Sequence, residues 1–137
     1  MAFDTRAFLA TPGVAKTIGE FGRNETIFTP GDACETVMYI QTGGVRLSVK
    51  STTGEEAVLA TLGPGEFFGE SCLAGQPFRI GSATAITPST ILTIAKDTMA
   101  RLLHQERGMA DRFIAHLLSR NIRLEEDLIL QLVGAGR

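Results

Sequence analysis

Short segments rich in β-forming residues follow one another along much of this chain, and turn residues separate them. Residues 45–50, Val-Arg-Leu-Ser-Val-Lys, alternate apolar and polar side chains with a period of two. This period is typical of an antiparallel strand with one buried face. Similar strands are predicted at residues 26–28, 36–40, 58–62, 82–87 and 90–94. Strands this short and this regularly spaced predict a mainly β sandwich, jelly roll or barrel.

A helical pattern replaces the strand pattern after residue 95. Residues 96–105 carry Met99, Leu102 and Leu103 at helical spacing, and Gly108 interrupts the pattern before a long helical segment at 109–133. About 25 residues at 1.5 Å per residue make a helix of roughly 37 Å, which is too long for one small barrel to cover. A short helix is also predicted at residues 3–11, where Pro12-Gly13 stops it.

The apolar residues of the long helix cover more than one stripe. A heptad pattern joins Ile114, Leu117, Leu124 and Leu128, with Asn121 at a core-type position. The flanking faces carry Phe113, Leu118, Ile122, Ile129 and Leu132. One face is therefore expected to dock on the β domain, while the four heptad residues form the seam of a homodimer. Asn121 either fixes the register of that seam or faces a bound ligand.

Size and charge narrow the classes of function. A chain of 137 residues suits one domain with a real core. Its net charge of −2 argues against nucleic acid binding by this segment alone. It has neither a membrane-length apolar run nor a signal-peptide pattern, so a cytoplasmic location is expected. Cys34 and Cys72 form no metal-spaced cluster, which favours reduced structural thiols over a disulfide or redox role.

Residues 62–87 hold the strongest candidate for a binding site. Gly69, Glu70 and Ser71 stand at a predicted strand-to-helix junction, and the small residues Ser82 and Ala83 follow a loop. Free backbone N–H groups and the positive end of a short helix at such a junction favour an anion. Small residues let a ligand approach the backbone closely. The stretch therefore predicts a cradle for a phosphate group.

This stretch resembles the phosphate-binding cassette of the cyclic nucleotide-binding domain in Crp/Fnr-family transcription regulators. Phe68, Gly69, Glu70 and Leu73 match the family pattern F-x-G-E-x-x-L, and Ser82-Ala83 matches the end of R-[ST]-A. The order of predicted elements is similar to the effector half of such a regulator over residues 16–133. In that family a winged helix-turn-helix that binds DNA follows the long helix.

The resemblance implies both the fold and the domain boundaries. Residues 1–107 would form a double-stranded β-helix, or jelly roll, with flanking short helices. Residues 108–133 would form the dimerisation helix. Residues 134–137 would begin a hinge to the winged helix-turn-helix, which is absent from this chain. DNA would then be bound only through that missing domain.

The resemblance also implies roles for single residues. The ligand would be cAMP or another cyclic nucleotide. Glu70 would accept a hydrogen bond from its ribose hydroxyl, and Gly69 and Ser71 would supply the close backbone. Ser82 and Ala83 would donate to its phosphate. The competing interpretations are that Glu70 is a first-turn acid or the partner of a nearby cation, and that Ser82 is an ordinary strand serine.

One departure from the family pattern concerns its arginine. The family has Arg directly before the Ser-Ala pair, where this chain has Gly81, and the nearest arginine is Arg79. Losing a charge-assisted contact costs about 1.5–3 kcal/mol per hydrogen bond. Residues i and i+2 of an extended strand share a face, so Arg79 is a candidate substitute. The alternative is an exposed loop arginine.

The leading hypothesis is a ligand-sensing and dimerisation domain that makes and breaks no bond. The alternative is a ligand-free dimerisation module whose pocket is filled by side chains. A cupin-type enzyme is disfavoured because its metal needs several His on strands, whereas His104 and His116 fall on predicted helices. A regulatory domain of a kinase or channel is also less favoured. Phe67 and Phe68 are predicted to be core residues rather than base-stacking groups.

Overall fold

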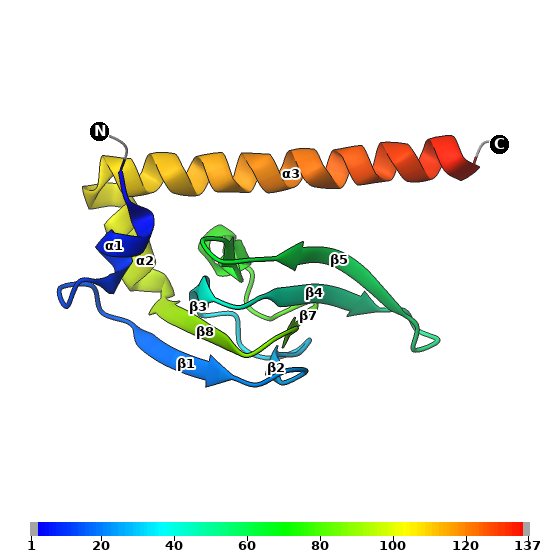
Figure 1. The fold of residues 1–137 in the computed structure, drawn as a ribbon, viewed down its shortest axis with the longest axis horizontal. Helices are drawn as coiled ribbons and strands as arrows, with labels where there is room; N and C mark the ends of the chain where they lie inside the picture. The colour runs from blue at the N-terminus through cyan, green and yellow to red at the C-terminus, as the bar shows by residue number, and fades with distance from the viewer. Residues whose placement is uncertain (1–2, 136–137) are drawn as a thin grey trace.

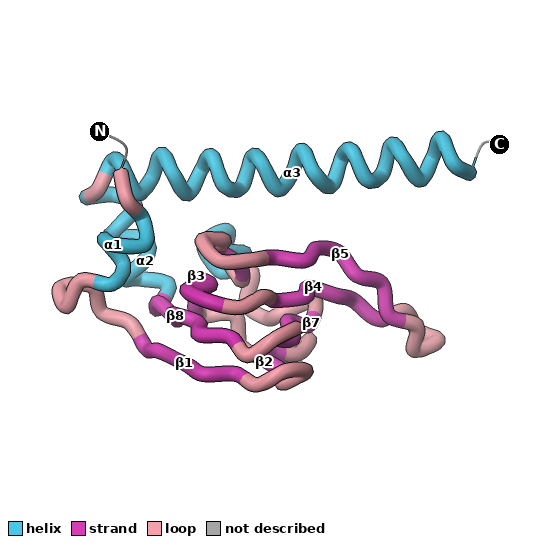
Figure 2. Tube along the Cα trace, viewed as in Figure 1, coloured by secondary structure: helices cyan, strands magenta, loops and turns pink. Residues whose placement is uncertain are grey.

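Two four-stranded antiparallel sheets form the β domain in the computed structural model, which describes residues 3–135 and side chains as far as Leu130. One sheet has the order β1-β8-β3-β6 and the other β2-β7-β4-β5. The strands are β1 Thr17–Phe21, β2 Thr26–Phe28, β3 Thr36–Thr42, β4 Val45–Lys50, β5 Glu56–Leu62, β6 Phe67–Phe68, β7 Ser82–Ala85 and β8 Ser89–Ala95. The helices gather at one end of this roll and along one side of it (Figure 1, Figure 2). The predicted fold class, a jelly roll followed by a long helix, is confirmed.

Strand β4 organises the sheet that carries the cassette. It pairs with β5 from Val45↔Leu62 to Lys50↔Glu56, so the two form a long hairpin. On its other edge it pairs with β7, where Ser48 lies opposite Ser82. This register brings the end of the cassette against the middle of β4.

Three α-helices accompany the roll: α1 Thr5–Ala10, α2 Lys96–Gln105 and α3 Arg107–Ala135. The Asp4 carboxylate caps α1 by accepting from the Ala7 N–H at 3.1 Å. Gly108 lies in the first turn of α3, whereas the sequence predicts an interruption there. Its lack of a side chain serves packing, because a Cβ at this position would come within 2.4 Å of the Phe3 ring.

The last helix is longer than predicted. It continues through Gly134 and Ala135, where the sequence predicts the start of a hinge. The rest of that predicted hinge, residues 136–137, lies outside the described residues. Helix α3 runs along the roll, and the β4–β5 hairpin points in the same direction as its C-terminal half (Figure 1).

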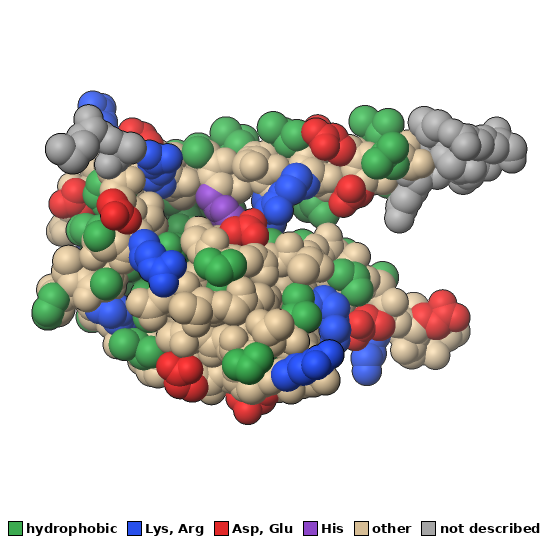
Figure 3. Space-filling model, viewed as in Figure 1, with side chains coloured by type: hydrophobic (Ala, Val, Ile, Leu, Met, Phe, Trp, Pro, Cys, Tyr) green, Lys and Arg blue, Asp and Glu red, His purple; other side chains and the backbone are tan. Residues whose placement is uncertain are grey.

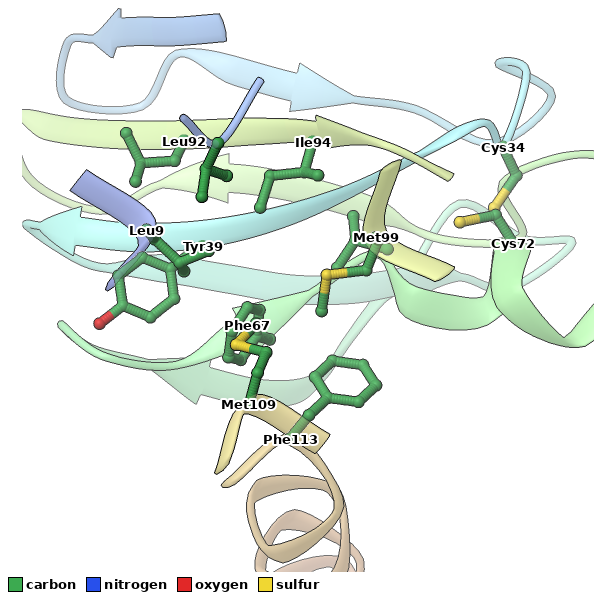
Figure 4. Close-up of a cluster of buried hydrophobic side chains, with 12 residues drawn as sticks. Leu9, Cys34, Tyr39, Phe67, Cys72, Leu92, Ile94, Met99, Met109 and Phe113 are labelled. Carbon is green, nitrogen blue, oxygen red and sulfur yellow. The ribbon is translucent and has the colours of Figure 1, made fainter. Parts of the chain in front are cut away.

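Two buried clusters form the core, and adjacent phenylalanines divide between them. The cluster beneath the helices contains Leu9, Cys34, Tyr39, Phe67, Cys72, Leu92, Ile94, Met99, Met109 and Phe113 among others (Figure 4). The cluster between the sheets contains Met38, Ile40, Val45, Leu62, Phe68, Ala83 and Ile91. Neighbouring strand residues point to opposite faces, so Phe67 joins the first cluster and Phe68 the second. The prediction that both are core residues is confirmed.

Both cysteines are free and buried. Their side chains lie close together at one end of the cluster beneath the helices (Figure 4). The Cys34 Sγ lies 3.4 Å from the Ser71 Oγ. Burial, together with the neighbouring Cys34, raises the pKa of the Cys72 thiol.

Among the described helices, none is both long enough and apolar enough to cross a bilayer.

Candidate ligand-binding site

The cassette turns at Gly69 and continues into a short 3-10 helix, η1 Glu70–Ala74. Gly69 has a φ of +76°, a left-handed conformation that favours glycine. A Cβ at Gly69 would lie 2.9 Å from the Arg79 Nη1, so the same residue also makes room for the arginine. The strand-to-helix junction that the sequence predicts is therefore present, with Glu70 in the first turn.

Arg79 points into the cassette rather than into solvent. Only 5% of it is exposed, while its neighbours Phe78 and Ile80 are largely exposed. Its Nη1 donates to the Gly69 carbonyl at 2.7 Å, and its Nη2 donates to the Thr36 carbonyl at 2.9 Å and hydroxyl at 3.1 Å. The guanidinium also lies 4.3 Å from the centre of the Phe28 ring. The chain's own acceptors thus hold this guanidinium inside the cassette.

Steric crowding prevents a side chain at Gly81, which stands in the family's arginine position. A Cβ there would come within 2.7 Å of the Ser48 carbonyl oxygen on β4, and within 3.3 Å of Val49. The backbone of the cassette packs too closely against β4 for any side chain at Gly81. The inward guanidinium comes instead from Arg79, two residues earlier and on the same side of the chain.

A hollow of about 140 Å³ opens where the cassette faces β4. It is lined by Phe28, Leu47, Ser48, Val49, Leu59, Gly69, Glu70, Ser71, Arg79, Ile80, Gly81 and Ser82. The structure thus brings together five of the six predicted cassette residues. The sixth, Ala83, is fully buried in the cluster between the sheets. The hollow is small beside ligand pockets in general, which are about 300–1,000 Å³.

Helix α3 contacts the cassette through a largely buried ion pair between Arg120 and Glu70. Arg120 also donates from its Nη1 to the Phe67 carbonyl at 2.8 Å. Burial lowers the pKa of the Arg120 guanidinium, and the nearby Glu66 opposes that shift. The carboxylate that the resemblance assigns to a ribose hydroxyl is therefore held by a cation from the long helix.

Two further side chains of α3 complete this contact. His116 places its Nε2 3.1 Å from the Phe67 carbonyl oxygen, and Arg123 pairs with Glu66 at 2.7 Å. The other Glu66 carboxylate oxygen accepts from the Gly63 N–H at 2.7 Å. Basic and acidic side chains meet in the gap between α3 and the roll (Figure 3).

Sequence analysis missed Arg120, Arg123 and Glu66 as site residues. A signal was present in the spacing, because His116, Arg120 and Arg123 lie four and three residues apart and so share one face of a helix. That polar stripe lies at one edge of the apolar surface of α3. The partners of these three side chains depend on how α3 packs on the roll, which the spacing of the residues along the helix does not show.

The predicted seam residues divide between two environments. Ile114, Leu124 and Leu128 are exposed, together with Leu118, Ile122 and Ile129. Leu117 is half-buried and packs against the cluster beneath the helices of its own chain. Asn121 is exposed, and its amide donates to Glu125 at 3.3 Å rather than lining the hollow. Hydrophobic side chains line the edge of α3 that faces away from the roll (Figure 3).

Comparison with known proteins defines the class to which this fold and cassette belong. The cyclic nucleotide-binding domain matches residues 18–106. The chain therefore belongs to the cyclic nucleotide-binding domain family. The relatives it resembles are transcription regulators of the Crp/Fnr type.

Two curated relatives and one solved structure show the extent of the likeness. The Cyclic AMP receptor protein of Thermus thermophilus is 34% identical over 114 residues, which cover 83% of this chain and 52% of that protein. The Global nitrogen regulator of Synechococcus elongatus is 34% identical over 110 residues, covering 79% and 50%. The structure of the Thermus thermophilus Catabolite Activator Protein matches with a TM-score of 0.70 and 32% identity, covering 87% and 55%. The chain spans about half the length of the curated relatives it matches.

Proposed function

We propose that this chain is the ligand-sensing and dimerisation domain of a Crp/Fnr-like transcription regulator. The cassette binds cAMP, another cyclic nucleotide or a related anionic effector, and α3 transmits its arrival to a DNA-binding domain outside this chain. The domain is cytoplasmic and acts by shifting a conformational equilibrium rather than by catalysis. The observation that carries this proposal is the Glu70–Arg120 ion pair, which joins the cassette to α3.

The ligand fits the cassette through complementary chemistry. An anionic phosphate suits the backbone at Gly69 and Ser71, the Ser82 hydroxyl and the Arg79 guanidinium, all of which line the hollow. A ribose hydroxyl suits the Glu70 carboxylate, which is an acceptor held in place by Arg120. A second hollow of about 120 Å³ lies between β5 and α3, and Leu59 lines both, so a ligand larger than a phosphate extends from one to the other.

Dimerisation is the second part of the proposal. Exposed isoleucines and leucines on α3 form an apolar surface that a second copy of the helix would bury. A hollow of about 600 Å³ lies between β5 and the C-terminal half of α3. Its apolar lining consists of Val58 and Leu59 from β5 and Leu124, Leu128 and Leu130 from α3. The exposed members of the predicted seam, Ile114, Leu124 and Leu128, lie on this surface.

One observation favours the alternative, a dimerisation module that binds no ligand. Arg79 donates to Gly69 and Thr36 of its own chain, and the hollow beside it measures about 140 Å³. An anion therefore has to draw the guanidinium away from acceptors it already has. This competition weakens binding, and it abolishes binding where the protein acceptors are the stronger ones.

Isothermal titration of the chain with cAMP and with cGMP separates these two functions. The sensing proposal expects saturable binding of at least one of them. It also expects Arg79→Gln to weaken binding by about tenfold or more, as losing a charge-assisted hydrogen bond does. Arg101→Gln, an exposed arginine on α2, is the matched control and leaves affinity unchanged. Absence of heat up to millimolar ligand would favour the ligand-free module.

A further inference from the structure

A separate hollow, of about 630 Å³, lies between residues 3–6, Tyr39 and the start of α3. We call it the N-terminal groove. It is lined by residues 3–6, Tyr39, Pro64, Gly65, Phe67, Arg112 and His116. It shares no lining residue with the cassette hollow. Nothing in the cassette's proposed function uses this groove.

Two arginines flank the N-terminal groove from different elements. Arg6 comes from α1 and Arg112 from the start of α3, and both are exposed. Within residues 3–130, neither forms an ion pair with a carboxylate. The one acidic residue of the lining, Asp4, uses its carboxylate to cap α1. The groove therefore carries an excess of positive charge.

Tyr39 supplies an unused donor in the wall of the groove. The residue is 2% exposed and lines the groove, and none of the hydrogen bonds among the described residues involves its hydroxyl. The hydroxyl lies beside the turn at Gly65, where an added Cβ would stand 3.9 Å from it. It points away from the buried cluster that surrounds the ring (Figure 4). The O–H is therefore available to donate to an acceptor that enters the groove.

Burial and the charges around the Tyr39 hydroxyl keep it protonated, so it remains a hydrogen-bond donor. Burial raises the pKa of Tyr39, while Arg6 lowers it and Asp4 raises it further. The phenol therefore remains protonated at neutral pH. An anionic oxygen beside it would accept from a neutral O–H and be attracted by both arginines.

We propose that the N-terminal groove is a second binding site, for a small organic anion whose carboxylate or phosphate oxygens lie between Arg6 and Arg112. One of these oxygens accepts from the Tyr39 hydroxyl. The apolar part of the anion contacts the Phe3 and Phe67 rings, which also line the groove. Such a ligand joins α1 to the start of α3, one turn before the His116 contact with Phe67. The site therefore acts on the same face of α3 as the cassette, about two turns nearer the start of the helix.

Titration with two simple probes tests this site on the whole chain. Pyrophosphate represents phosphate-bearing ligands and succinate represents dicarboxylates, each followed by amide chemical shifts at constant ionic strength. At least one probe is expected to bind at one site per chain, with shifts around Gly65 and Arg112. Binding of pyrophosphate alone identifies a phosphate ligand, and binding of succinate alone identifies a carboxylate.

Variants separate this groove from the cassette. Arg6→Gln and Arg112→Gln should each weaken binding by about tenfold, and Tyr39→Phe by several-fold. Arg101→Gln is the matched control and should have no effect. Saturating cAMP should not displace the probe, and absence of cAMP binding would leave this proposal intact. The proposal is overturned if neither probe binds at 10 mM, or if Arg79→Gln abolishes binding while Arg6→Gln and Arg112→Gln leave it unchanged.

Discussion

Glu70 of the cassette and Arg120 of α3 form a largely buried ion pair. Arg120 also donates to the Phe67 carbonyl, so one guanidinium contacts both the side chain and the backbone of the cassette. A change at Glu70 therefore reaches α3 without any intervening residue. A buried pair of this kind is costly to break from one side, because the remaining charge has no partner.

The Glu70–Arg120 pair should show strong coupling in a double-mutant cycle. We expect Glu70→Gln and Arg120→Gln each to lower the free energy of unfolding by about 3 kcal/mol, because each leaves a buried charge unpaired. The double variant should lose less than the sum of the two. Urea unfolding followed by circular dichroism measures all three. Arg46→Gln is a control, because Arg46 pairs with Glu56 at the surface of the hairpin. Additive single effects would contradict the coupling.

Substitution of Gly69 should distort the cassette and lower the stability of the chain while leaving the roll folded. Gly69→Ala forces a Cβ into a left-handed conformation and toward the Arg79 guanidinium, and should cost about 1–3 kcal/mol of stability. Thermal unfolding measures this cost. Gly54→Ala is the matched control, since Gly54 also has a positive φ but has nothing within 4 Å of its Cβ position. If both variants lose equal stability, the contact with Arg79 contributes nothing.

The exposed face of α3 should hold the dimer together. Sedimentation velocity is expected to show a dimer of the 14.7 kDa chain, and Ile114→Lys should shift it toward monomer because it places a charge in the seam. Ile18→Lys provides the control, since Ile18 on β1 is 58% exposed and Ile114 is 55% exposed. A wild-type chain that sediments as a monomer at all concentrations would refute this prediction.

Alkaline pH should destabilise the domain through its buried thiol. Burial raises the pKa of Cys72, so the unfolded chain releases the thiol proton at lower pH than the folded chain does. Stability from this group is complete below the unfolded pKa and is lost as pH rises toward the folded pKa. The free energy of unfolding should therefore begin to fall as the pH rises above the unfolded thiol pKa of about 8.5. In Cys72→Ala that fall should be smaller. An identical fall in both proteins would exclude Cys72 as a cause.

Local chemistry in the sequence was enough to predict a mainly β sandwich, jelly roll or barrel, the strand-to-helix junction at Gly69-Glu70 and the long helix. The resemblance to Crp/Fnr regulators selected the jelly roll and the cassette. Strand periodicity depends only on which face of each segment is buried, and the Gly69-Glu70 junction follows from neighbouring residues. The sequence allowed two orientations of Arg79, inward as a substitute for the family's arginine or outward as an exposed loop residue. Its 5% exposure agrees with the inward orientation.

Tertiary structure decided the partners of these residues. Gly81 is excluded from carrying a side chain by the Ser48 carbonyl, which reaches it only through the pairing of β4 with β7. Leu117 packs on its own chain because α3 docks with that side toward the roll. Arg120 meets Glu70, and Tyr39 faces Arg6, only after segments distant in the chain have packed. Which strands and helices form depends mainly on short-range periodicity and turn chemistry, so a reading of the residues predicts them. The contacts that define both candidate sites depend on long-range packing instead.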